Sequence, residues 1–407
     1  MIIKGLYTHP IKSLRPIALF DTIITPTGPL YDREFMLIRP AIEEGNADEN
    51  MQISRYSQLC LFSQEFYPKC SSSEDAEGVL VTYTPPEKTR EEGQGQRAKN
   101  GVLLLGERRV LRVPLRPDTE GLAPRNVLLH KTECLAHDMG DSPYSEFFTQ
   151  CLGINVRLLY IAPGNLRTPL GNIAPSPRKE SGGILSWFGL FSDKQEKHNI
   201  TFADCAPLLV TTEWSCEDVS RRFQRVVVSD GGFHRGMDIS KFRPNIVLGP
   251  LHSSPVGNPT GSSIIPAWDE DFWAELAIYP QHPSYDDSIS ECYKILLTQN
   301  CGRCRSINVE YNSGEFGDVN LPGGEEPLKY LMKDRRVDPG VKWSPVFGRY
   351  GWLMGKASVK VSVGDRVEVV RRNEERTRFC KYGDSEADLG GSLKLINVIT
   401  DWPGLST

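Results

Sequence analysis

The sequence predicts a mainly β protein with a few helices, an α+β architecture whose strands form barrels or sandwiches. Short apolar and β-branched runs recur along the chain and are separated by Pro, Gly, Asp or Asn, which is typical of strands joined by turns. Helical periodicity occurs in two segments. The length of 407 residues corresponds to two or three domains at about 150 residues each.

Strand-like runs dominate the first 160 residues. We expect seven strands there, at 2–7, 19–24, 34–38, 79–83, 102–105, 110–113 and 155–161. Two polar insertions, 43–50 and 71–100, interrupt this pattern. In the second insertion the polar stretches flank the strand predicted at 79–83, and the composition of both insertions predicts long solvent-exposed loops.

A linker is predicted at 163–199, because Pro, Gly, Ser and charged residues prevail there. It contains an apolar octet, 184–191 (ILSWFGLF), which is unusual in such a setting. One interpretation is a hydrophobic tether that packs on the body of the protein. The other is a contact with a membrane surface or a partner protein.

The second half combines two helices with further strands. The first helix is predicted at 212–226, where Cys216, Val219, Phe223 and Val226 recur at helical spacing. The second is predicted at 325–335, with a proline in its first turn. Strands are predicted at 245–248, 292–297, 306–310, 350–353 and 358–370. The tail, 373–407, is weakly patterned.

Composition narrows the class of protein. The 47 Lys and Arg against 52 Asp and Glu give a net charge of −5, which argues against a nucleic-acid binder. The apolar octet is less than half of the roughly 18 residues that a membrane-spanning helix needs. The N-terminus lacks the features of a secretory or transit signal, and the ten cysteines are scattered. We therefore expect an intracellular protein, cytoplasmic or associated with mitochondria, with reduced thiols.

Common catalytic motifs are absent from the sequence. It contains no phosphate-binding G-x-x-x-x-G-K-[ST], no G-x-G-x-x-G between a strand and a helix, no G-x-S-x-G and no H-E-x-x-H. The motif that remains is Cys301-Gly302-Arg303-Cys304. Spacing alone leaves four interpretations of it: half of a zinc site, a redox pair, two ordinary thiols, or one thiolate that binds a soft metal centre. Arg303 and Arg305 would favour a thiolate at a neighbouring cysteine.

Three short strings place cations beside hydrogen-bonding groups. In 241–247 (KFRPNIV), Arg243 and Asn245 lie two residues apart, and in an extended segment they would share one face. Such a pair could hold a phosphate or a pyrimidine-like ring. The strings 9–13 (HPIKS) and 31–33 (YDR) place a lysine and an arginine at predicted strand ends, where such residues are more often simply solvated.

Taken together and in order, these strings resemble the MOSC family of molybdenum-cofactor proteins. Within that family, the sequence looks most similar to the amidoxime-reducing components of mitochondria and their bacterial relatives. The strings that carry the resemblance are HPIKS, YDREFMLI, FADCAPLLV, KFRPNIV, AWDEDFWAEL, CGRC, EPLKYL, SPVFGRY and VGDRVEVV. They span nearly the whole chain apart from the insertions and the tail.

The resemblance implies an N-terminal MOSC-type β-barrel domain followed by a MOSC β-barrel domain, with molybdopterin bound between them. The implied boundaries are 1–162 for the first domain, 163–199 for the linker, 200–372 for the MOSC domain and 373–407 for the tail. Cys304 matches the family's molybdenum ligand and would be the catalytic residue. The implied cofactor-binding residues are Lys12, Ser13, Arg33, Asp204, Cys205, Ala206, Arg243, Asn245 and Tyr350.

The function implied by the resemblance is reduction of N-hydroxylated compounds, such as amidoximes and hydroxylamines, at a molybdenum cofactor. The sequence contains no flavin, haem or iron–sulfur motif, so we expect the electrons to come from a partner. The resemblance implies that this partner is cytochrome b5 with its NADH-dependent reductase. The resemblance also implies pyridoxal phosphate binding. Two alternatives share the same site residues: a molybdenum-cofactor or sulfur carrier without reductive turnover, and a degenerate scaffold that acts as a binding module.

Overall fold

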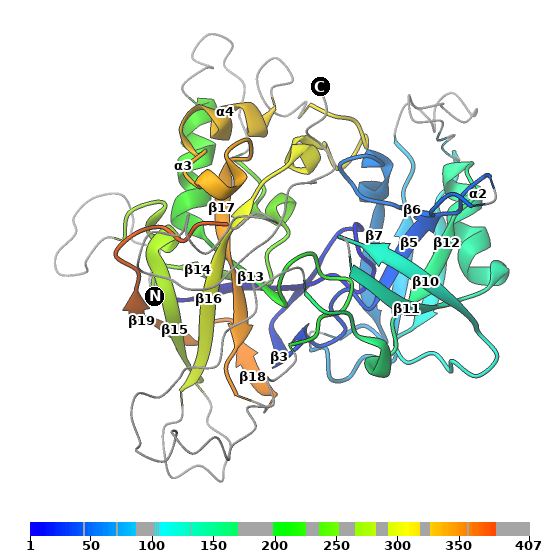
Figure 1. The fold of residues 1–407 in the computed structure, drawn as a ribbon, viewed down its shortest axis with the longest axis horizontal. Coiled ribbons are helices and arrows are strands. Elements are labelled where there is room, and N and C mark those ends of the chain that lie inside the picture. Colours follow the sequence, from blue (N-terminus) through cyan, green and yellow to red (C-terminus); the bar gives the residue numbers. More distant parts are fainter. Residues whose placement is uncertain are drawn as a thin grey trace.

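The computed structural model describes most of the chain, and strands dominate it (Figure 1). The described residues are 1–43, 45–70, 72–86, 102, 104, 106–130, 132–169, 198–224, 236–251, 265–281, 292–317, 326–355 and 358–379. The apolar octet at 184–191 lies outside them. No helix within these ranges is both long enough and apolar enough to cross a bilayer.

Seven strands close into a barrel on the left of Figure 1. In order around the barrel they are β14 (Ile246–Gly249), β13 (Leu208–Thr212), β17 (Val346–Leu353), β16 (Tyr293–Gly302), β15 (Trp273–Tyr279), β19 (Arg366–Arg372) and β1 (Ile2–Thr8). Pairing of β1 with β14 closes the ring. Closure leaves no free edge among these strands, which protects them from pairing with other chains.

The other body is built from two antiparallel sheets. The five-stranded sheet has the order β10 (Ala123–Leu129), β11 (Thr132–Asp138), β12 (Arg157–Tyr160), β5 (Phe35–Arg39) and β6 (Glu49–Asn50). The three-stranded sheet consists of β7 (Phe62–Tyr67), β8 (Gly78–Tyr83) and β9 (Arg109–Pro114). Helix α2 (Glu146–Leu152) buries Phe147 and Phe148 against Phe62. This aromatic cluster is the centre of that body.

The N-terminal strands bind the two bodies together. β1, the first strand of the chain, lies between β14 and β19 in the barrel. Its C-terminal end also pairs antiparallel with β2 (Ile17–Leu19). A small third sheet pairs β18 (Val359–Ser362) with β3 (Asp21–Thr25), and β3 with β4 (Gly28–Pro29). One buried apolar cluster includes residues from both bodies, among them Ile3, Phe62 and Leu297. The residues that begin the chain therefore complete the fold of its second half.

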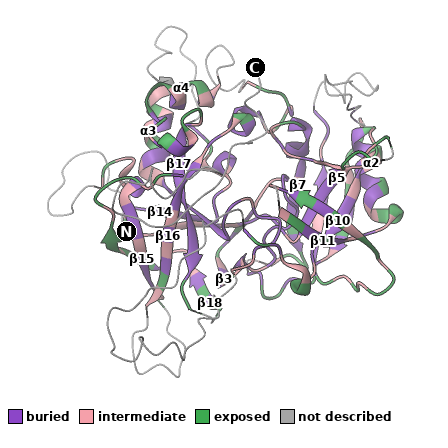
Figure 2. Ribbon diagram, viewed as in Figure 1, coloured by how far each residue is buried: buried purple, intermediate pink, exposed green. Residues whose placement is uncertain are grey.

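Helices α3 (Glu213–Gln224) and α4 (Pro327–Asp334) lie side by side at one end of the barrel (Figure 1). Cys216 and Val219 of α3 and Leu331 of α4 share one buried cluster. Figure 2 shows buried inner faces and exposed outer turns on both helices. The two predicted helices are confirmed, with slightly shorter bounds.

Most of the predicted strands are confirmed, namely those that correspond to β1, β5, β8, β9, β12, β14, β16 and β17. The predicted strand 306–310 is wrong, because a 3-10 turn occupies Arg305–Asn308. Two of the predicted strands each correspond to two shorter strands in the structure. The run 19–24 breaks at the exposed Phe20, and the run 358–370 breaks at Gly364, which has a φ of 100°. Apolar content continues across these turns, so periodicity alone does not reveal them.

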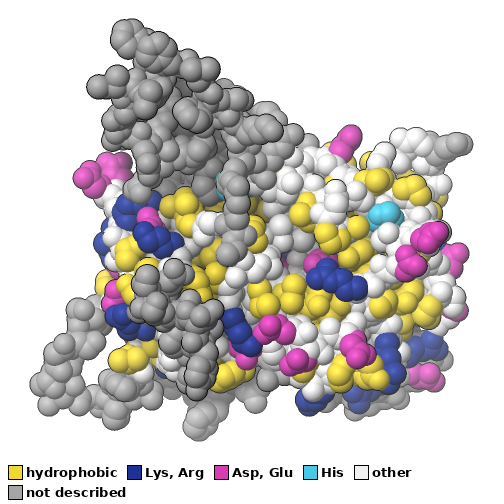
Figure 3. Space-filling model, turned by 90° about the horizontal axis from the view of Figure 1, so that it is seen from below, with side chains coloured by type: hydrophobic (Ala, Val, Ile, Leu, Met, Phe, Trp, Pro, Cys, Tyr) yellow, Lys and Arg dark blue, Asp and Glu magenta, His cyan; other side chains and the backbone are white. Residues whose placement is uncertain are grey.

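Charged residues are interspersed on the surface. In the described part of the face shown in Figure 3, Lys and Arg side chains lie among Asp and Glu side chains rather than along a basic stripe. A continuous basic stripe is the usual footprint of a nucleic-acid interface. The distribution agrees with the small net charge of −5.

A buried ionic network joins the barrel to the segment that follows it. Both carboxylate oxygens of Asp271 accept hydrogen bonds from Arg335, at 2.9 and 2.8 Å, and one also accepts from Nε of Arg376 at 2.8 Å. Arg349 donates to the Asp271 carbonyl at 3.1 Å and to the hydroxyl of Thr377 at 2.6 Å. Asp271 and Arg349 are completely buried. The first residues of the predicted tail are thus tied to the barrel core.

Glu270, beside this network, makes stability depend on pH. Burial raises the pKa of this carboxyl from 4.5 to about 7, and Glu270 is 1% exposed. The folded protein therefore holds the proton more tightly than the unfolded chain between these two values. We expect the free energy of unfolding to fall by up to about 3 kcal/mol as pH rises from about 4 to 8 because of this group.

The Glu270→Gln variant is expected to remove this part of the pH dependence, because glutamine does not ionise. Chemical denaturation at a series of pH values checks the expectation. The matched control is Glu368→Gln, at an exposed position of β19, which should keep the wild-type slope. Identical slopes for wild type and Glu270→Gln would contradict the prediction.

Candidate functional site

One pocket brings together residues from the N-terminal turns and from the barrel strands. Its cavity volume is about 80 Å³. The residues that line it are Arg33, Asp204, Ala206, Leu209, Phe242, Arg243, Asn245, Cys301, Gly302, Arg303, Cys304, Ser306 and Tyr350. Seven of the ten predicted site residues are among them.

Several residues at this pocket have a backbone conformation that costs energy. Ser13, Arg33 and Arg243 have φ angles of 71°, 55° and 56°, in the left-handed region that side-chain-bearing residues rarely adopt. His130, which contacts the site, has a φ of 50°. Such strain persists only where the surroundings impose it, and it clusters at functional sites. The tight turns direct long side chains toward one space.

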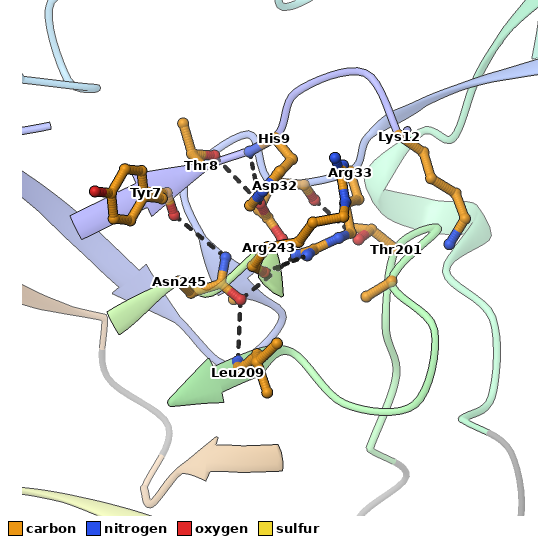
Figure 4. Close-up of polar contacts among 12 residues, drawn as sticks. Tyr7, Thr8, His9, Lys12, Asp32, Arg33, Thr201, Leu209, Arg243 and Asn245 are labelled. Carbon is orange, nitrogen blue, oxygen red and sulfur yellow. Dashed lines mark hydrogen bonds and ion pairs between the residues drawn. The ribbon is translucent and has the colours of Figure 1, made fainter. Parts of the chain in front are cut away.

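Arg33 is positioned by Asp32 (Figure 4). One guanidinium nitrogen of Arg33 donates to the Asp32 carboxylate and lies 3.4 Å from Oδ1 of Asn245. The Asp32 carboxylate also accepts from the His9 backbone N–H at 2.8 Å. Burial lowers the pKa of His9 to about 3, so this ring stays neutral beside the cations. Asp32 therefore compensates the buried charge of Arg33 and fixes its direction.

Arg243 and Asn245 both line the pocket, but the backbone does not place them there as predicted. Arg243 has left-handed backbone angles, so the segment is not extended at that residue. Oδ1 of Asn245 accepts from the backbone N–H of Leu209 at 3.0 Å, and its amide donates to the Tyr7 carbonyl at 3.2 Å (Figure 4). The Asn245 side chain thus ties β1 to β13 at the pocket wall.

Arg243 carries a hydrogen-bond donor without a protein partner. Its Nη1 donates to the Leu14 carbonyl at 2.8 Å, whereas its buried Nη2 has no hydrogen-bond partner in the described structure. Burial lowers the pKa of this guanidinium to about 10, yet it remains charged at neutral pH. A buried cationic donor without a partner is costly. An anionic group in the pocket would satisfy it.

Lys12 does not line the pocket but lies behind it. Its ammonium donates to the carboxylate of Asp204 and, at 2.8 Å, to the carbonyl of Phe202. His130 lies with Nε2 2.9 Å from the same Asp204 oxygen. Burial alone would raise the pKa of Asp204, but Lys12 and His130 lower it well below its usual value. Ser13 follows Lys12 as a buried residue of the same turn.

Arg167 organises the turn that contains Asp204, and sequence reasoning placed it in the linker. It is 1% exposed, and its guanidinium donates to the carbonyls of Thr201, Ala203 and Asp204. A single arginine within a polar segment gives no local signal of such a role. Only the packing of 198–204 beside β11 reveals it.

We expect Arg167→Ala to lower the free energy of unfolding by about 3 kcal/mol, because three buried carbonyls lose a charged donor. Urea denaturation followed by circular dichroism measures this change. The control is Arg112→Ala, an exposed arginine that lies 4.3 Å from the Tyr67 ring, for which the loss should stay below about 1 kcal/mol. Equal losses for the two variants would contradict the assigned role.

The two cysteines of the C-x-x-C motif have different surroundings. Cys301, on β16, is 3% exposed, and Arg303 donates to its sulfur at 2.9 Å. Cys304 is partly exposed to the pocket, and its sulfur lies 3.2 Å from Oγ of Ser306. Arg305 instead stacks on Phe316 at 4.1 Å. Arg303 thus contacts the first cysteine of the pair, and the second is the accessible thiol.

The remaining predicted residues form the rear wall. Cys205, Ala206 and Tyr350 pack in a buried cluster with Cys301 and Phe379. Burial raises the pKa of Cys205 to about 12, so this thiol stays protonated. Burial, together with the nearby cysteines, raises the pKa of the Tyr350 phenol well above its usual value. These groups shape the pocket as neutral side chains.

The segment after β19 also supports this wall. The backbone N–H of Phe379 donates to both oxygens of the Asp338 carboxylate, at 3.0 and 3.1 Å. The Thr377 carbonyl accepts from the amide of Asn300 at 3.2 Å. The sequence indicated neither contact, because 373–379 lacks apolar periodicity.

The side chains that line the pocket suit an anionic ligand and one bond between a cysteine sulfur and a soft metal. Three guanidinium groups, those of Arg33, Arg243 and Arg303, line it together with the single carboxylate of Asp204. The described residues contain no group of three or more His, Cys, Asp or Glu side chains placed to hold a metal. A metal at Cys304 would therefore need further ligands from a bound cofactor.

Comparison with known proteins assigns domains to both halves of the chain. Residues 1–155 match the MOSC N-terminal beta barrel domain, and residues 197–368 match the MOSC domain. Mitochondrial amidoxime reducing component 2 of Bos taurus is 30% identical over 182 residues, which is 44% of this chain and 41% of that protein. Mitochondrial amidoxime-reducing component 1 of Homo sapiens is 27% identical over 175 residues, which is 42% of this chain and 39% of that protein.

A more distant similarity covers more of the chain. Molybdenum cofactor sulfurase of Arabidopsis thaliana is 22% identical over 336 residues, which is 82% of this chain but 31% of that protein. All three matches span well under half the length of these relatives.

Proposed function

The chain belongs to the proteins that carry a MOSC N-terminal beta barrel domain followed by a MOSC domain, and on that premise we propose that it is a molybdenum-cofactor oxidoreductase that reduces N-hydroxylated compounds. The observation that carries the proposal is the pairing, in one pocket, of the accessible Cys304 thiol with the unpartnered Nη2 of Arg243. Relatives named as amidoxime-reducing components support the choice of substrate class.

In this proposal, residues of the chain hold an anionic molybdopterin by its charged groups. Arg33 and Arg243 provide guanidinium donors to the phosphate and pterin, and Arg303 adds positive charge beside the C-x-x-C motif. The Cys304 sulfur provides the protein ligand to the metal. The bound cofactor would supply two-electron transfer and removal of an oxygen atom from the substrate.

The overall reaction consumes two electrons and two protons. An N-hydroxylated compound loses its oxygen as water, and the N–O bond is replaced by an N–H bond. By resemblance, the electron donor is cytochrome b5, itself reduced by its NADH-dependent reductase. The mitochondrial relatives favour association with that organelle. Pyridoxal phosphate forms no part of the proposal, because no lysine is among the described residues that line the pocket.

The second candidate function is a carrier that binds the molybdenum cofactor or its sulfur without reductive turnover. The similarity to molybdenum cofactor sulfurase, which covers 82% of this chain, supports this second function. Both functions require the same anion-binding pocket, so the pocket alone does not separate them.

The experiment expresses the full chain in a host that makes the cofactor, then measures molybdenum and released pterin in the purified protein. Reduction of benzamidoxime is followed with cytochrome b5, its reductase and NADH. Stoichiometric cofactor with turnover supports the reductase. Stoichiometric cofactor without turnover, with either the protein donor or a chemical one, supports the carrier. Absence of both molybdenum and pterin contradicts both functions and favours the degenerate scaffold.

A further inference from the structure

A second pocket lies behind the turn that supplies Arg33. Its cavity volume is about 180 Å³. The residues that line it are Thr25, Thr27, Pro29, Leu30, Tyr31, Asp32, Glu34, Arg116, Ile161, Pro163, Leu166 and Thr201. Arg33 lines the first pocket, whereas its neighbours Asp32 and Glu34 line the second. The two pockets therefore lie on opposite sides of the same short segment.

Five of the twelve residues that line this pocket have apolar side chains, namely Pro29, Leu30, Ile161, Pro163 and Leu166. Such a lining accommodates a hydrocarbon body, and a few polar groups then fix its orientation.

Most polar groups of the second pocket have partners within the protein. The hydroxyls of Thr25 and Thr27 bond to each other at 2.9 Å. The Thr201 hydroxyl donates to the Asp32 carbonyl at 2.9 Å, and the Asp32 carboxylate is held by Arg33. These groups are therefore engaged in holding the pocket walls.

Glu34 is the exception. Its side chain is 13% exposed, and its buried Oε2 has no hydrogen-bond partner in the described structure. The nearest cation is Arg116, whose Nη1 lies 3.8 Å from this oxygen, beyond hydrogen-bond distance. Arg116 is half exposed and stacks on the Tyr31 ring, 4.8 Å from its centre. It therefore compensates Glu34 only weakly.

Burial raises the pKa of Glu34 to about 7, and the charge of Arg116 opposes this effect. The effect of burial is therefore larger than the effect of the Arg116 charge, and the Oε2 atom of Glu34 remains without a hydrogen-bond donor in the described structure. A ligand that brings a positive charge and N–H donors would provide one.

We propose that this second pocket binds a small organic cation, a protonated amine with a hydrocarbon body, whose ammonium group donates hydrogen bonds to Glu34. The apolar residues enclose the hydrocarbon, and Arg116 at the rim moves toward solvent. Binding here involves no covalent step. It is independent of the function proposed for the first pocket.

The experiment uses isothermal titration of the full chain with 2-phenylethylammonium, with 2-phenylethanol and phenylacetate as the neutral and anionic analogues. We expect one binding site and at least about tenfold weaker binding of either analogue, because a charged hydrogen bond is lost. The Glu34→Gln variant should weaken binding of the ammonium compound by a similar factor. The matched control is Glu65→Gln on β7, an exposed position outside both pockets, which should bind as wild type does.

A second variant tests the location of the site. Leu166→Trp places a larger side chain on the pocket wall and leaves Glu34 unchanged, and it should also abolish binding if the ligand occupies this space. Thermal unfolding confirms that each variant is folded. Wild-type affinity in either Glu34→Gln or Leu166→Trp, or equal affinity for the neutral analogue, overturns the proposal.

Discussion

Replacing Cys304 by alanine is expected to remove at least about nine tenths of the molybdenum from the purified protein and at least about 99% of any reductase activity. The reason is that Cys304 is the accessible thiol of the pocket, and thiolate ligands hold soft metal centres in preference to other side chains. The fold should persist, because the side chain is partly exposed and its one described side-chain partner is the Ser306 hydroxyl. Metal analysis by plasma mass spectrometry, with circular dichroism as the folding check, measures both effects.

Two cysteine variants serve as comparisons for Cys304→Ala. Cys292→Ala changes another partly exposed thiol of this chain and should leave metal content unchanged. Cys301→Ala removes the sulfur that accepts from Arg303, so we expect lower stability and weaker cofactor retention rather than loss of the metal ligand. Full molybdenum content in Cys304→Ala would show that another group binds the metal.

Replacing Asp271 by alanine is expected to lower the free energy of unfolding by about 3–5 kcal/mol, the largest stability effect that the structure predicts. The change removes a completely buried carboxylate and leaves Arg335, which is 4% exposed, without its counter-ion. Breaking one side of a buried ion pair costs this much because the remaining charge stays desolvated. Arg376 would also lose its carboxylate partner, which removes one of the contacts that anchor residues 373–379.

Chemical denaturation measures this loss, and the ion pair on the protein surface supplies the control. Asp334 pairs with Arg222 at 2.6 Å, but its side chain is 57% exposed. Asp334→Ala should therefore cost less than about 1 kcal/mol. Comparable losses for Asp271→Ala and Asp334→Ala would mean that burial does not govern the strength of these pairs.

Much of the fold follows from local patterns in the sequence. Runs such as Phe35–Arg39 and Gly78–Tyr83 are strands because β-branched and aromatic residues cover a pleated, buried surface and turn residues bound them. The hairpin of β10 and β11 gave no such signal, since apolar and polar residues do not alternate regularly along it and Leu128 and Leu135 lie at exposed positions. Prediction failed at 306–310 because a buried turn can be as apolar as a strand.

Some residues of the candidate site could also be predicted from the sequence, and others could not. Arg33, Arg243, Asn245 and Cys304 are found from short strings, because each string combines a turn with a polar or sulfur-containing side chain. Arg167 and His130 were missed, since both act through residues that are distant in the chain. The carbonyls that Arg167 contacts are 34 to 37 positions away, and the carboxylate that His130 contacts is 74 positions away. Their neighbours in the sequence carry no trace of those contacts.

The sequence by itself determined that this protein is mainly β and that a cysteine pair and several strand-end cations are candidates for one anion-binding site. Only the tertiary structure decided that Cys304 is the accessible cysteine of the pair and that Nη2 of Arg243 has no hydrogen-bond partner in the described structure. It also decided that the first strand of the chain closes the barrel of its second half. The physical reason is the range of the interactions. Periodicity and turn chemistry act between residues a few positions apart, whereas strand closure, burial and charge compensation depend on residues hundreds of positions apart in the chain.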